Sequence, residues 1–298
     1  MKINADRFRV ARGTKVDLTK WPTLAAPVYE SDDHYAQLLK EYVGTINAQQ
    51  QLLNASESFA VLVIFQAMDA GGKDGAVEHV MTGINPQGCR VTSFKAPSEQ
   101  ELKHDFLWRA VRELPERGRI GIFNRSYYED VLVVRVHPEK LRGAGLSKPQ
   151  LDGNRVWHER YRSIVELERH LHANSTRIVK IFLHISKEEQ RQRLLQRIDR
   201  PEKNWKIRPE DIEERRFWAD YMKVYGKCLA ATSTRRAPWF VVPADDKRNA
   251  RLIISKILLD AFIALDLKFP EAPPARRKEL AAMRAQLAKE GRGKQPRA

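Results

Sequence analysis

The chain has 298 residues, of which 42% are hydrophobic and 31% charged, and its formal net charge is +15. The composition is ordinary for a folded globular protein. Its longest apolar run, Phe59–Phe65, is far shorter than the roughly 20 residues that span a bilayer, and no secretory signal is visible near Met1. The two cysteines, Cys89 and Cys228, form neither a disulfide framework nor a metal-ligand spacing, so we expect reduced thiols and a cytoplasmic protein.

The elements begin with an irregular extension over residues 1–30, which we expect to wrap the surface of a neighbouring element. A helix then runs from a cap at Ser31 to about Asn54. The β-rich run Phe59–Phe65 predicts a buried strand, followed by a glycine-rich turn and a helix over Gly72–Met81.

The same alternation continues to residue 268. Strands are expected at Cys89–Phe94, Arg119–Phe123, Arg177–Ile185 and Trp239–Val242, and helices at Ser98–Leu114, Leu151–His172, from Ser186, and from the fifth strand to Leu267. Alternating strands and helices predict a three-layer α/β/α domain with a mainly parallel, five-stranded sheet over residues 31–268. Residues 269–298 form a basic tail, with a helix expected over Arg277–Lys289 and disorder in the rest.

The positive charge is not confined to this tail. Residues 271–298 carry eight Lys/Arg and three Glu, so about +10 remains on the rest of the chain. A strongly basic folded body suggests an anionic partner: nucleic acid, an acidic membrane surface or polyphosphate. A solvated basic surface without a special partner explains the charge equally well.

The run from Ala67 to Gly75, Ala-Met-Asp-Ala-Gly-Gly-Lys-Asp-Gly, lies between a buried strand and a helix N-terminus. Glycines allow backbone N–H groups to face an anion, the helix start adds partial positive charge, and Lys73 would neutralise phosphate oxygens. The predicted phosphate-binding residues here are Ala70, Gly71, Gly72, Lys73 and Asp74. The run differs from the G-x-x-x-x-G-K-[ST] pattern at Ala67 and Asp74, and a glycine-rich turn without a ligand is the alternative.

Asp69 lies inside this loop, where bound phosphate would repel a carboxylate unless a cation intervened. Mg²⁺ favours carboxylate and phosphate oxygens together, so Asp69 is a candidate magnesium ligand. It could also orient or deprotonate an attacking phosphate oxygen. The alternative is an aspartate that only stabilises the turn.

A second polar run, Asn124–Asp130, follows the third strand and is expected at the carboxyl edge of the sheet, where open α/β folds bind ligands. Arg125 is suited to bidentate contact with phosphate. An ion pair of Arg125 with Glu129 or Asp130 is the alternative.

A third, basic segment at about residues 190–210 predicts a helical lid that closes over phosphates and excludes water. Its alternative is a solvated face, and packing is slightly favoured over base stacking for Trp205. The cations of this segment are Arg191, Arg193, Arg197, Arg200, Lys203, Lys206 and Arg208.

Together these runs resemble the family-2 polyphosphate kinases. The resemblance covers roughly residues 30–268 and rests on four segments: Asp69–Gly75, Phe94–Ser98, Asn124–Tyr128 and Arg197–Lys206. It implies a P-loop kinase-like fold similar to that of thymidylate kinase, with Mg²⁺, adenine nucleotides and polyphosphate as ligands. It also implies a homodimer or homotetramer, and it leaves guanine nucleotides open as further substrates.

The resemblance also assigns residue roles. Asp69, Lys73 and Arg125 are the expected catalytic residues, with Arg197, Arg200, Lys203 and Lys206 holding the polyphosphate chain. Asn124, Tyr128 and Arg135 are expected at the nucleotide, and Asp69 and Asp130 at the metal. Asn124, where many members have Asp, and the segment 128–137 resemble the subgroup that phosphorylates AMP as well as ADP.

Two other functions remain open from the residues alone. An ATP-dependent nucleoside monophosphate kinase would share the fold and the loop, although the excess basic charge argues against it. A nucleic-acid-binding P-loop protein would suit the charge, but no aromatic-interleaved basic patch is present and we expect neither nucleic acid nor membrane as a partner.

Overall fold

The computed structural model describes residues 3–143, 145–146 and 153–290. Within these ranges the strands form one parallel, five-stranded sheet, as the sequence predicts, and the structure gives their order as β2-β3-β1-β4-β5. Their bounds are β1 Ala60–Ala67, β2 Cys89–Ser93, β3 Ile120–Asn124, β4 Thr176–His184 and β5 Trp239–Pro243.

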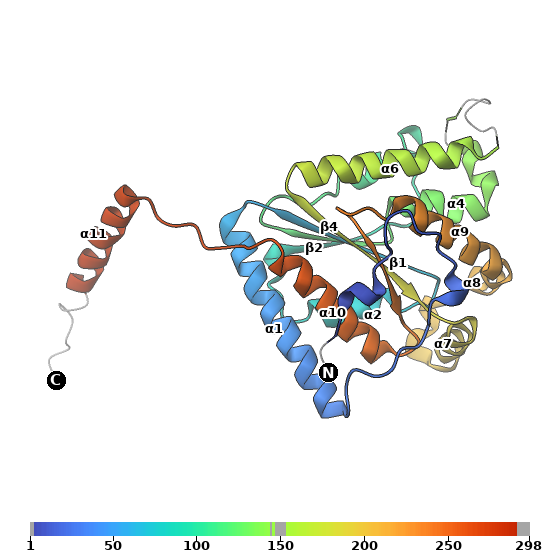
Figure 1. Cartoon of the computed structure of the whole chain (residues 1–298), viewed down its shortest axis with the longest axis horizontal. Helices are drawn as coiled ribbons and strands as arrows, with labels where there is room; N and C mark the ends of the chain where they lie inside the picture. Colours follow the sequence, from blue (N-terminus) through green and yellow to red (C-terminus); the bar gives the residue numbers. More distant parts are fainter. Residues whose placement is uncertain (1–2, 144, 147–152, 291–298) are drawn as a thin grey trace. The chain divides into compact units, whose positions relative to one another are not determined.

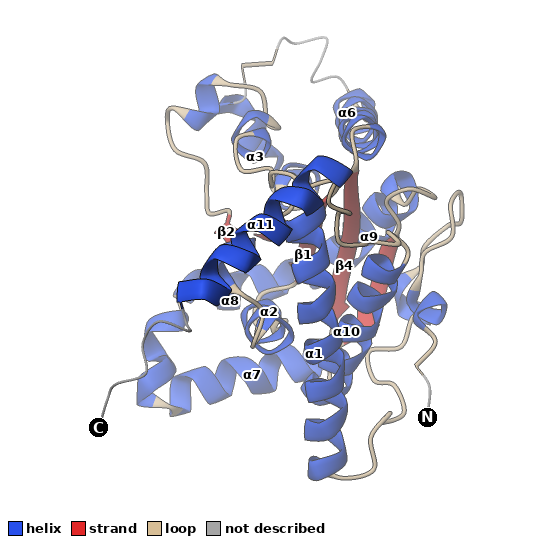
Figure 2. Cartoon of the chain, turned by 90° about the vertical axis from the view of Figure 1, so that its left-hand side faces the viewer, coloured by secondary structure: helices blue, strands red, loops and turns tan. Residues whose placement is uncertain are grey.

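The sheet has helices on both faces (Figures 1 and 2). The α-helices are α1 Asp32–Ser56, α2 Lys73–Met81, α3 Trp108–Val111, α4 Val133–Val136, α6 Arg155–Ala173, α7 Lys187–Asp199, α8 Pro209–Glu213, α9 Trp218–Thr232, α10 Lys247–Ile263 and α11 Pro274–Glu290. None of them, within the described ranges, combines the length and apolar character that crossing a bilayer would require.

Alternate residues of β1 build two separate cores, because successive side chains of a strand point to opposite faces. Val61, Val63 and Phe65 pack with α1, α2 and α10 on one face of the sheet. Leu62 and Ile64 pack with α6 and α9 on the other. All eight residues of β1 are buried, which is why the strand reads as a continuous apolar run rather than an alternating one.

The first thirty residues contribute to the second core. The N–H of Val10 donates to the carbonyl of Trp239 at 2.8 Å, and Val16 and Leu18 are buried. The segment therefore lines the β5 edge of the sheet. Residues 1–267 form one compact unit and residues 268–298 a second, in which α11 buries none of its residues. The predicted disorder of the tail falls partly on residues 291–298, outside the described ranges.

Two helix predictions were wrong. Ser98 and Glu101 do exchange the reciprocal capping contacts, at 2.7 and 3.2 Å, but only the single turn Glu101–Lys103 and the short α3 follow. A cap helps to start a helix, whereas burial of an apolar face sustains it, and Leu102 is 41% exposed. The fifteen-residue helix α9 was not predicted, although Tyr221, Val224, Tyr225, Cys228 and Leu229 follow helical spacing.

Candidate active site

The phosphate loop joins the central strand β1 to α2. Gly71 cannot be replaced without a shift, because a Cβ there would lie 2.5 Å from the Cβ of Ala67 and 2.7 Å from the carbonyl oxygen of Met68. Gly72, the N-cap of α2, has φ +92°, and Ala70 has φ +57°. Left-handed backbone at two nearby residues turns the chain sharply and aims it into a helix start.

Lys73 is the first residue of α2, and its side chain is almost fully buried (8% exposed). Its Nζ donates to the carbonyl of Ala67 at 3.3 Å. Burial, reinforced by the nearby Arg125, lowers the pKa of Lys73, while the carboxylate of Asp69 opposes this shift. An ammonium held in this way gains strongly from an added anion, such as a phosphate oxygen.

Side chains of α7 hold the loop from the other side. Gln190 Nε2 donates to the carbonyl of Asp69 at 2.9 Å, and Arg193 Nη1 donates to that of Ala70 at 3.3 Å. Arg193 is itself fixed by Glu189 at 2.7 Å. These contacts bind the carbonyls of Asp69 and Ala70, while the N–H of Gly71 donates to the carbonyl of Met68 at 3.0 Å within the loop.

The end of β3 brings Asn124 and Arg125 to the same place, since parallel strands end at one edge of a sheet. Asn124 donates from Nδ2 to Asp74 Oδ1 at 2.6 Å. Arg125, at φ +65°, pairs with Asp69 at 2.7 Å and lies 3.7 Å from Glu129. Arg125 therefore forms two contacts: the ion pair with Glu129 that was the alternative interpretation, and the ion pair with Asp69 of the phosphate loop. Burial raises the pKa of Glu129, and Arg125 partly offsets this.

These residues line a cleft of about 1120 Å³. Eleven Lys/Arg side chains and five Asp/Glu side chains face it, a net of +6 that suits a polyanion. The cations are Lys73, Lys95, Arg125, Lys140, Arg193, Arg197, Lys203, Lys206, Arg208, Lys247 and Arg251.

The lid consists of α7 and the 3-10 helix η7 (Pro201–Lys206). The side-chain amide of Asn204 ties its turn together by donating to the carbonyls of Arg197, Ile198 and Arg200 at 2.8, 2.7 and 3.2 Å. Trp205 lines the cleft and is 75% exposed, so the packing interpretation was wrong. The ammonium of Lys206 lies 4.8 Å from the centre of the indole ring.

Most of the predicted site residues therefore gather in this cleft. They are Asp69, Ala70, Gly71, Gly72, Lys73, Asp74, Asn124, Arg125, Arg197, Lys203 and Lys206.

Four predicted residues face elsewhere. Tyr128 is fully buried, and its hydroxyl donates to Glu168 at 2.7 Å. Arg135 donates to the hydroxyl of Tyr161 at 2.8 Å. Arg200 is exposed and outside the residues that line the cleft.

Asp130 is the fourth: its carboxylate lies 3.7 Å from Arg160, and it is not among the described residues that line the cleft, so its predicted contact with a metal ion there has no support in the structure. The reason is common to Tyr128 and Asp130: both belong to the 3-10 helix η5 (Tyr127–Val131), which turns these side chains away from the cleft. Adjacency to Arg125 in sequence does not specify side-chain direction.

Sequence reasoning missed Lys247 and Arg251, at the start of α10, whereas Arg193, one of the cations of the predicted lid, does line the cleft. Burial lowers the pKa of Lys247, and the neighbouring Arg193 and Lys203 lower it further. The sequence did contain a signal for Lys247 and Arg251, because a helix that follows a parallel strand starts at the same sheet edge as the phosphate loop.

Two carboxylates, Asp69 and Asp74, line the cleft on either side of Lys73 and could hold a magnesium ion. In the described ranges no three His, Cys, Asp or Glu side chains are grouped as a metal cage. Mg²⁺ needs no such cage in nucleotide sites, where one or two carboxylates and substrate phosphates share it with water. The donor set therefore fits the ion.

Comparison with known proteins agrees with this geometry. The family model described as Polyphosphate kinase 2 (PPK2) matches residues 29–270. An ADP-polyphosphate phosphotransferase of Rhodopseudomonas palustris is 60% identical over 289 residues, which cover 97% of this chain and 100% of that protein. An AMP/ADP-polyphosphate phosphotransferase of Meiothermus ruber is 47% identical over 229 residues, covering 77% and 81%.

Among solved structures, polyphosphate kinase 2 from Arthrobacter aurescens superposes with a TM-score of 0.82 at 38% identity, covering 94% of this chain and 96% of that one. The chain belongs to the polyphosphate kinase 2 family.

Proposed function

We propose that this protein transfers phosphoryl groups between inorganic polyphosphate and nucleotides, making ATP from ADP and accepting AMP as a second substrate, with Mg²⁺ as cofactor. One observation carries the proposal: a phosphate loop opens into a cleft whose side chains have a net charge of +6. Linear polyphosphate carries about one negative charge per phosphate, so it needs such an extended cationic lining.

The two sides of the cleft carry different side chains, which suggests that polyphosphate binds to one side and the nucleotide to the other. Cations of the lid and α10, among them Lys203, Lys206 and Lys247, line one side of the cleft and suit the polyphosphate chain. Phe94, Lys95 and Asn124, at the ends of β2 and β3, offer an apolar ring beside one cation and one amide, which suits a nucleotide.

Transfer between two phosphate chains requires positioning and charge neutralisation rather than a covalent enzyme intermediate. Lys73, the first residue of α2, and Arg125, directly after β3, both line the cleft and would neutralise the oxygens of the transferring group. Asp69 and Asp74 would hold Mg²⁺, which supplies charge stabilisation at the bridging phosphate oxygens. Phosphate would draw Arg125 from its pair with Asp69 and so free that carboxylate for the ion.

AMP as an acceptor rests on two features. Asn124 bonds Asp74 within the cleft, and the Meiothermus relative is named for both AMP and ADP. The Rhodopseudomonas relative is named for ADP alone. Guanine nucleotides, assembly as a homodimer or homotetramer, and a cytoplasmic location are further parts of the proposal.

The test is an ATP-detection assay with purified protein, Mg²⁺, long-chain polyphosphate, and ADP or AMP in separate reactions. ATP from both reactions supports the full proposal, and ATP from ADP alone removes AMP as an acceptor. Turnover only when ATP replaces polyphosphate as donor to AMP would point to an ordinary nucleoside monophosphate kinase. Replacing Mg²⁺ by EDTA should abolish product, and undiminished product would remove the metal.

A further inference from the structure

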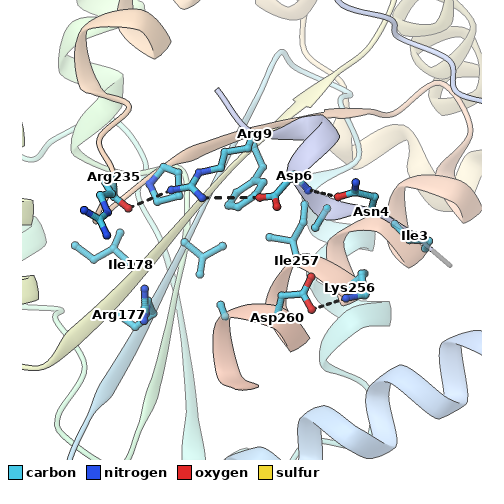
Figure 3. A pocket seen from close by; sticks show the side chains of 15 residues that line it. Ile3, Asn4, Asp6, Arg9, Arg177, Ile178, Arg235, Lys256, Ile257 and Asp260 are labelled. Atoms are coloured by element: carbon cyan, nitrogen blue, oxygen red, sulfur yellow. Dashed lines mark hydrogen bonds and ion pairs between the residues drawn. The ribbon is translucent and has the colours of Figure 1, made fainter. Parts of the chain in front are cut away.

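A second cavity, of about 500 Å³, is lined by residues near the starts of β4 and β5, among others (Figure 3). The cleft, in contrast, lies at the carboxyl ends of the strands. The walls of the second cavity come from the N-terminal segment, from Arg177 at the start of β4, from the approach to β5, and from α10. Arg177 and the cleft residue Leu183 are six positions apart on β4, which corresponds to roughly 20 Å along a strand. One small ligand therefore cannot occupy both sites.

The cavity combines an apolar wall with a cationic rim. Ile3, Ile178, Phe240 and Ile257 supply apolar surface. Four cations and two carboxylates also face it: Arg9, Arg177, Arg235 and Lys256 against Asp6 and Asp260. This mixture is typical of sites for small organic ligands, in which few polar groups fix the orientation of an apolar body.

Each of the two carboxylates already forms an ion pair with one of these cations. Lys256 pairs with Asp260, one helical turn away on α10. Arg9 lies 3.8 Å from Asp6 and donates to the carbonyl of Arg235 at 3.2 Å. Figure 3 shows both pairs at the cavity.

Among the described residues that line the cavity, neither carboxylate pairs with Arg177. Within the described ranges, no hydrogen bond or ion pair binds the guanidinium of Arg177 or of Arg235. Arg177 is half-buried, and burial lowers its pKa. A half-buried guanidinium without a protein acceptor would gain a charge-assisted hydrogen bond from an anion in the cavity.

We propose that this cavity binds a mononucleotide, with its phosphate at Arg177 and Arg235 and its base against the apolar wall around Phe240. Inorganic polyphosphate has no apolar part and gains nothing from that wall. The volume is within the range of roughly 300–1000 Å³ that holds small organic ligands. This site is separate from the cleft and does not depend on the transfer reaction proposed above.

The experiment is photolabelling of the full-length protein with 8-azido-ADP, followed by peptide mapping. Label is expected in two groups of peptides: those of the cleft, and those containing residues 3–9, 177–179 or 235–240. Excess ADP should remove the second group of labels, while equal concentrations of inorganic phosphate or polyphosphate should not. Label confined to cleft peptides overturns the proposal. Equal displacement by inorganic phosphate overturns the nucleotide and leaves a simple anion site.

Variants make the assignment specific. Arg177→Gln should lower labelling of the second group roughly tenfold, as expected for a lost charge-assisted contact, without lowering labelling of the cleft peptides. Ala261→Phe, which fills the cavity from α10, should do the same by steric exclusion. Arg7→Gln, an exposed arginine nearby that does not line the cavity, is the matched control and should label like the wild type. Unchanged labelling in both Arg177→Gln and Ala261→Phe would overturn the proposal.

Discussion

At the scale of single residues, Lys73 and Arg125 meet in one corner of the cleft although they are 52 positions apart in sequence. Each is balanced by a carboxylate of the same site, Arg125 directly by Asp69 at 2.7 Å. The arrangement brings the buried ammonium of Lys73 close to the partly exposed guanidinium of Arg125, and burial together with the charge of Arg125 lowers the pKa of Lys73. A bound anion would offset the repulsion between these two cations.

Lys73→Ala should therefore reduce kcat/KM for polyphosphate-dependent ATP formation by about 10²–10³, the cost typical of one lost donor in a preorganised site. The coupled assay measures this directly, and circular dichroism should show an unchanged fold. Lys227→Ala, on the exposed face of α9, is the control and should retain full activity. A Lys73→Ala enzyme with near-normal kcat/KM would exclude the phosphate-loop assignment.

Ionisation of the Asp130 carboxyl makes the free energy of unfolding depend on pH. Burial raises the pKa of its carboxyl to about 6, and Arg160 at 3.7 Å offsets this only in part. The folded protein then keeps a proton that the unfolded chain releases near the ordinary value of 3.8. Because the folded state binds more protons between these values, this group makes stability fall as pH rises from about 4 to about 6.

Asp130→Asn should remove that term. The free energy of unfolding at pH 4 minus that at pH 7 should become smaller in the variant by up to about 3 kcal/mol. Urea titrations at pH 4, 5.5 and 7 measure the difference, with Asp220→Asn, on an exposed side chain, as the control for loss of one charge. Parallel pH profiles for wild type and Asp130→Asn would contradict the effect of burial.

At the scale of elements, a buried polar network holds η5, α6 and β4 together behind the cleft. Lys180 of β4 pairs with Glu168 of α6 at 2.6 Å, and both are essentially inaccessible to solvent. Glu168 also accepts the hydroxyls of Tyr127 and Tyr128 at 3.0 and 2.7 Å. The network anchors the turn that begins directly after Arg125, so Tyr128 supports the site without touching it.

Glu168→Gln should lower the free energy of unfolding by about 3–5 kcal/mol, because it leaves Lys180 buried without a counter-charge. The double variant Glu168→Gln/Lys180→Met should lose less than the sum of the two single variants. Urea unfolding measures all three, and Glu166→Gln, in an exposed pair on the same helix, should cost under about 1 kcal/mol. Additive losses in the double variant would show that the two charges are not coupled.

The lid depends on Asn204 in a comparable way. Its amide donates to three carbonyls at the α7–η7 junction, and that junction sets the direction of Lys203, Trp205 and Lys206. Asn204→Ala should raise the KM for polyphosphate several-fold with a smaller change in the KM for ADP, because only the cationic side of the cleft is loosened. Asn174→Ala removes a similar amide-to-carbonyl bond at the far end of α6 and is the control. Equal changes in both KM values would argue against a lid confined to polyphosphate.

At the scale of the whole molecule, charge is divided between the body and the tail. Residues 271–298 carry a net +5, whereas the cations of the cleft all belong to residues 1–267. Counter-ion release should make the KM for polyphosphate rise steeply with salt, by roughly tenfold or more between 50 and 200 mM KCl.

A chain ending at Pro270 should keep the same slope of log KM against log salt, and the same unfolding free energy, because the binding cations and both cores remain. Kinetics over the salt series with the full and shortened chains measures this. A flatter slope in the shortened chain would assign part of the polyphosphate contact to the tail. A KM independent of salt in both chains would contradict an electrostatic site.

The sequence by itself determined those features that depend only on neighbouring residues along the chain. The apolar run of β1, the glycines of the phosphate loop and the alternation of strands and helices specify a parallel α/β sheet with its ligand edge, because strand and turn preferences are set by near neighbours. Asp69, Lys73 and Arg125 could be predicted together for this reason.

The tertiary structure alone decided side-chain direction and partners. Tyr128 and Asp130 follow the site residue Arg125 closely in sequence, yet both contact α6, since a short 3-10 turn has no periodicity that reveals its buried side. Arg135, in α4, also contacts α6, through the hydroxyl of Tyr161. The cavity at Arg177 likewise joins four segments distant in sequence, and only their packing leaves one guanidinium half-buried without an acceptor among the described residues. Burial is a property of the assembled fold, so local sequence could not specify it.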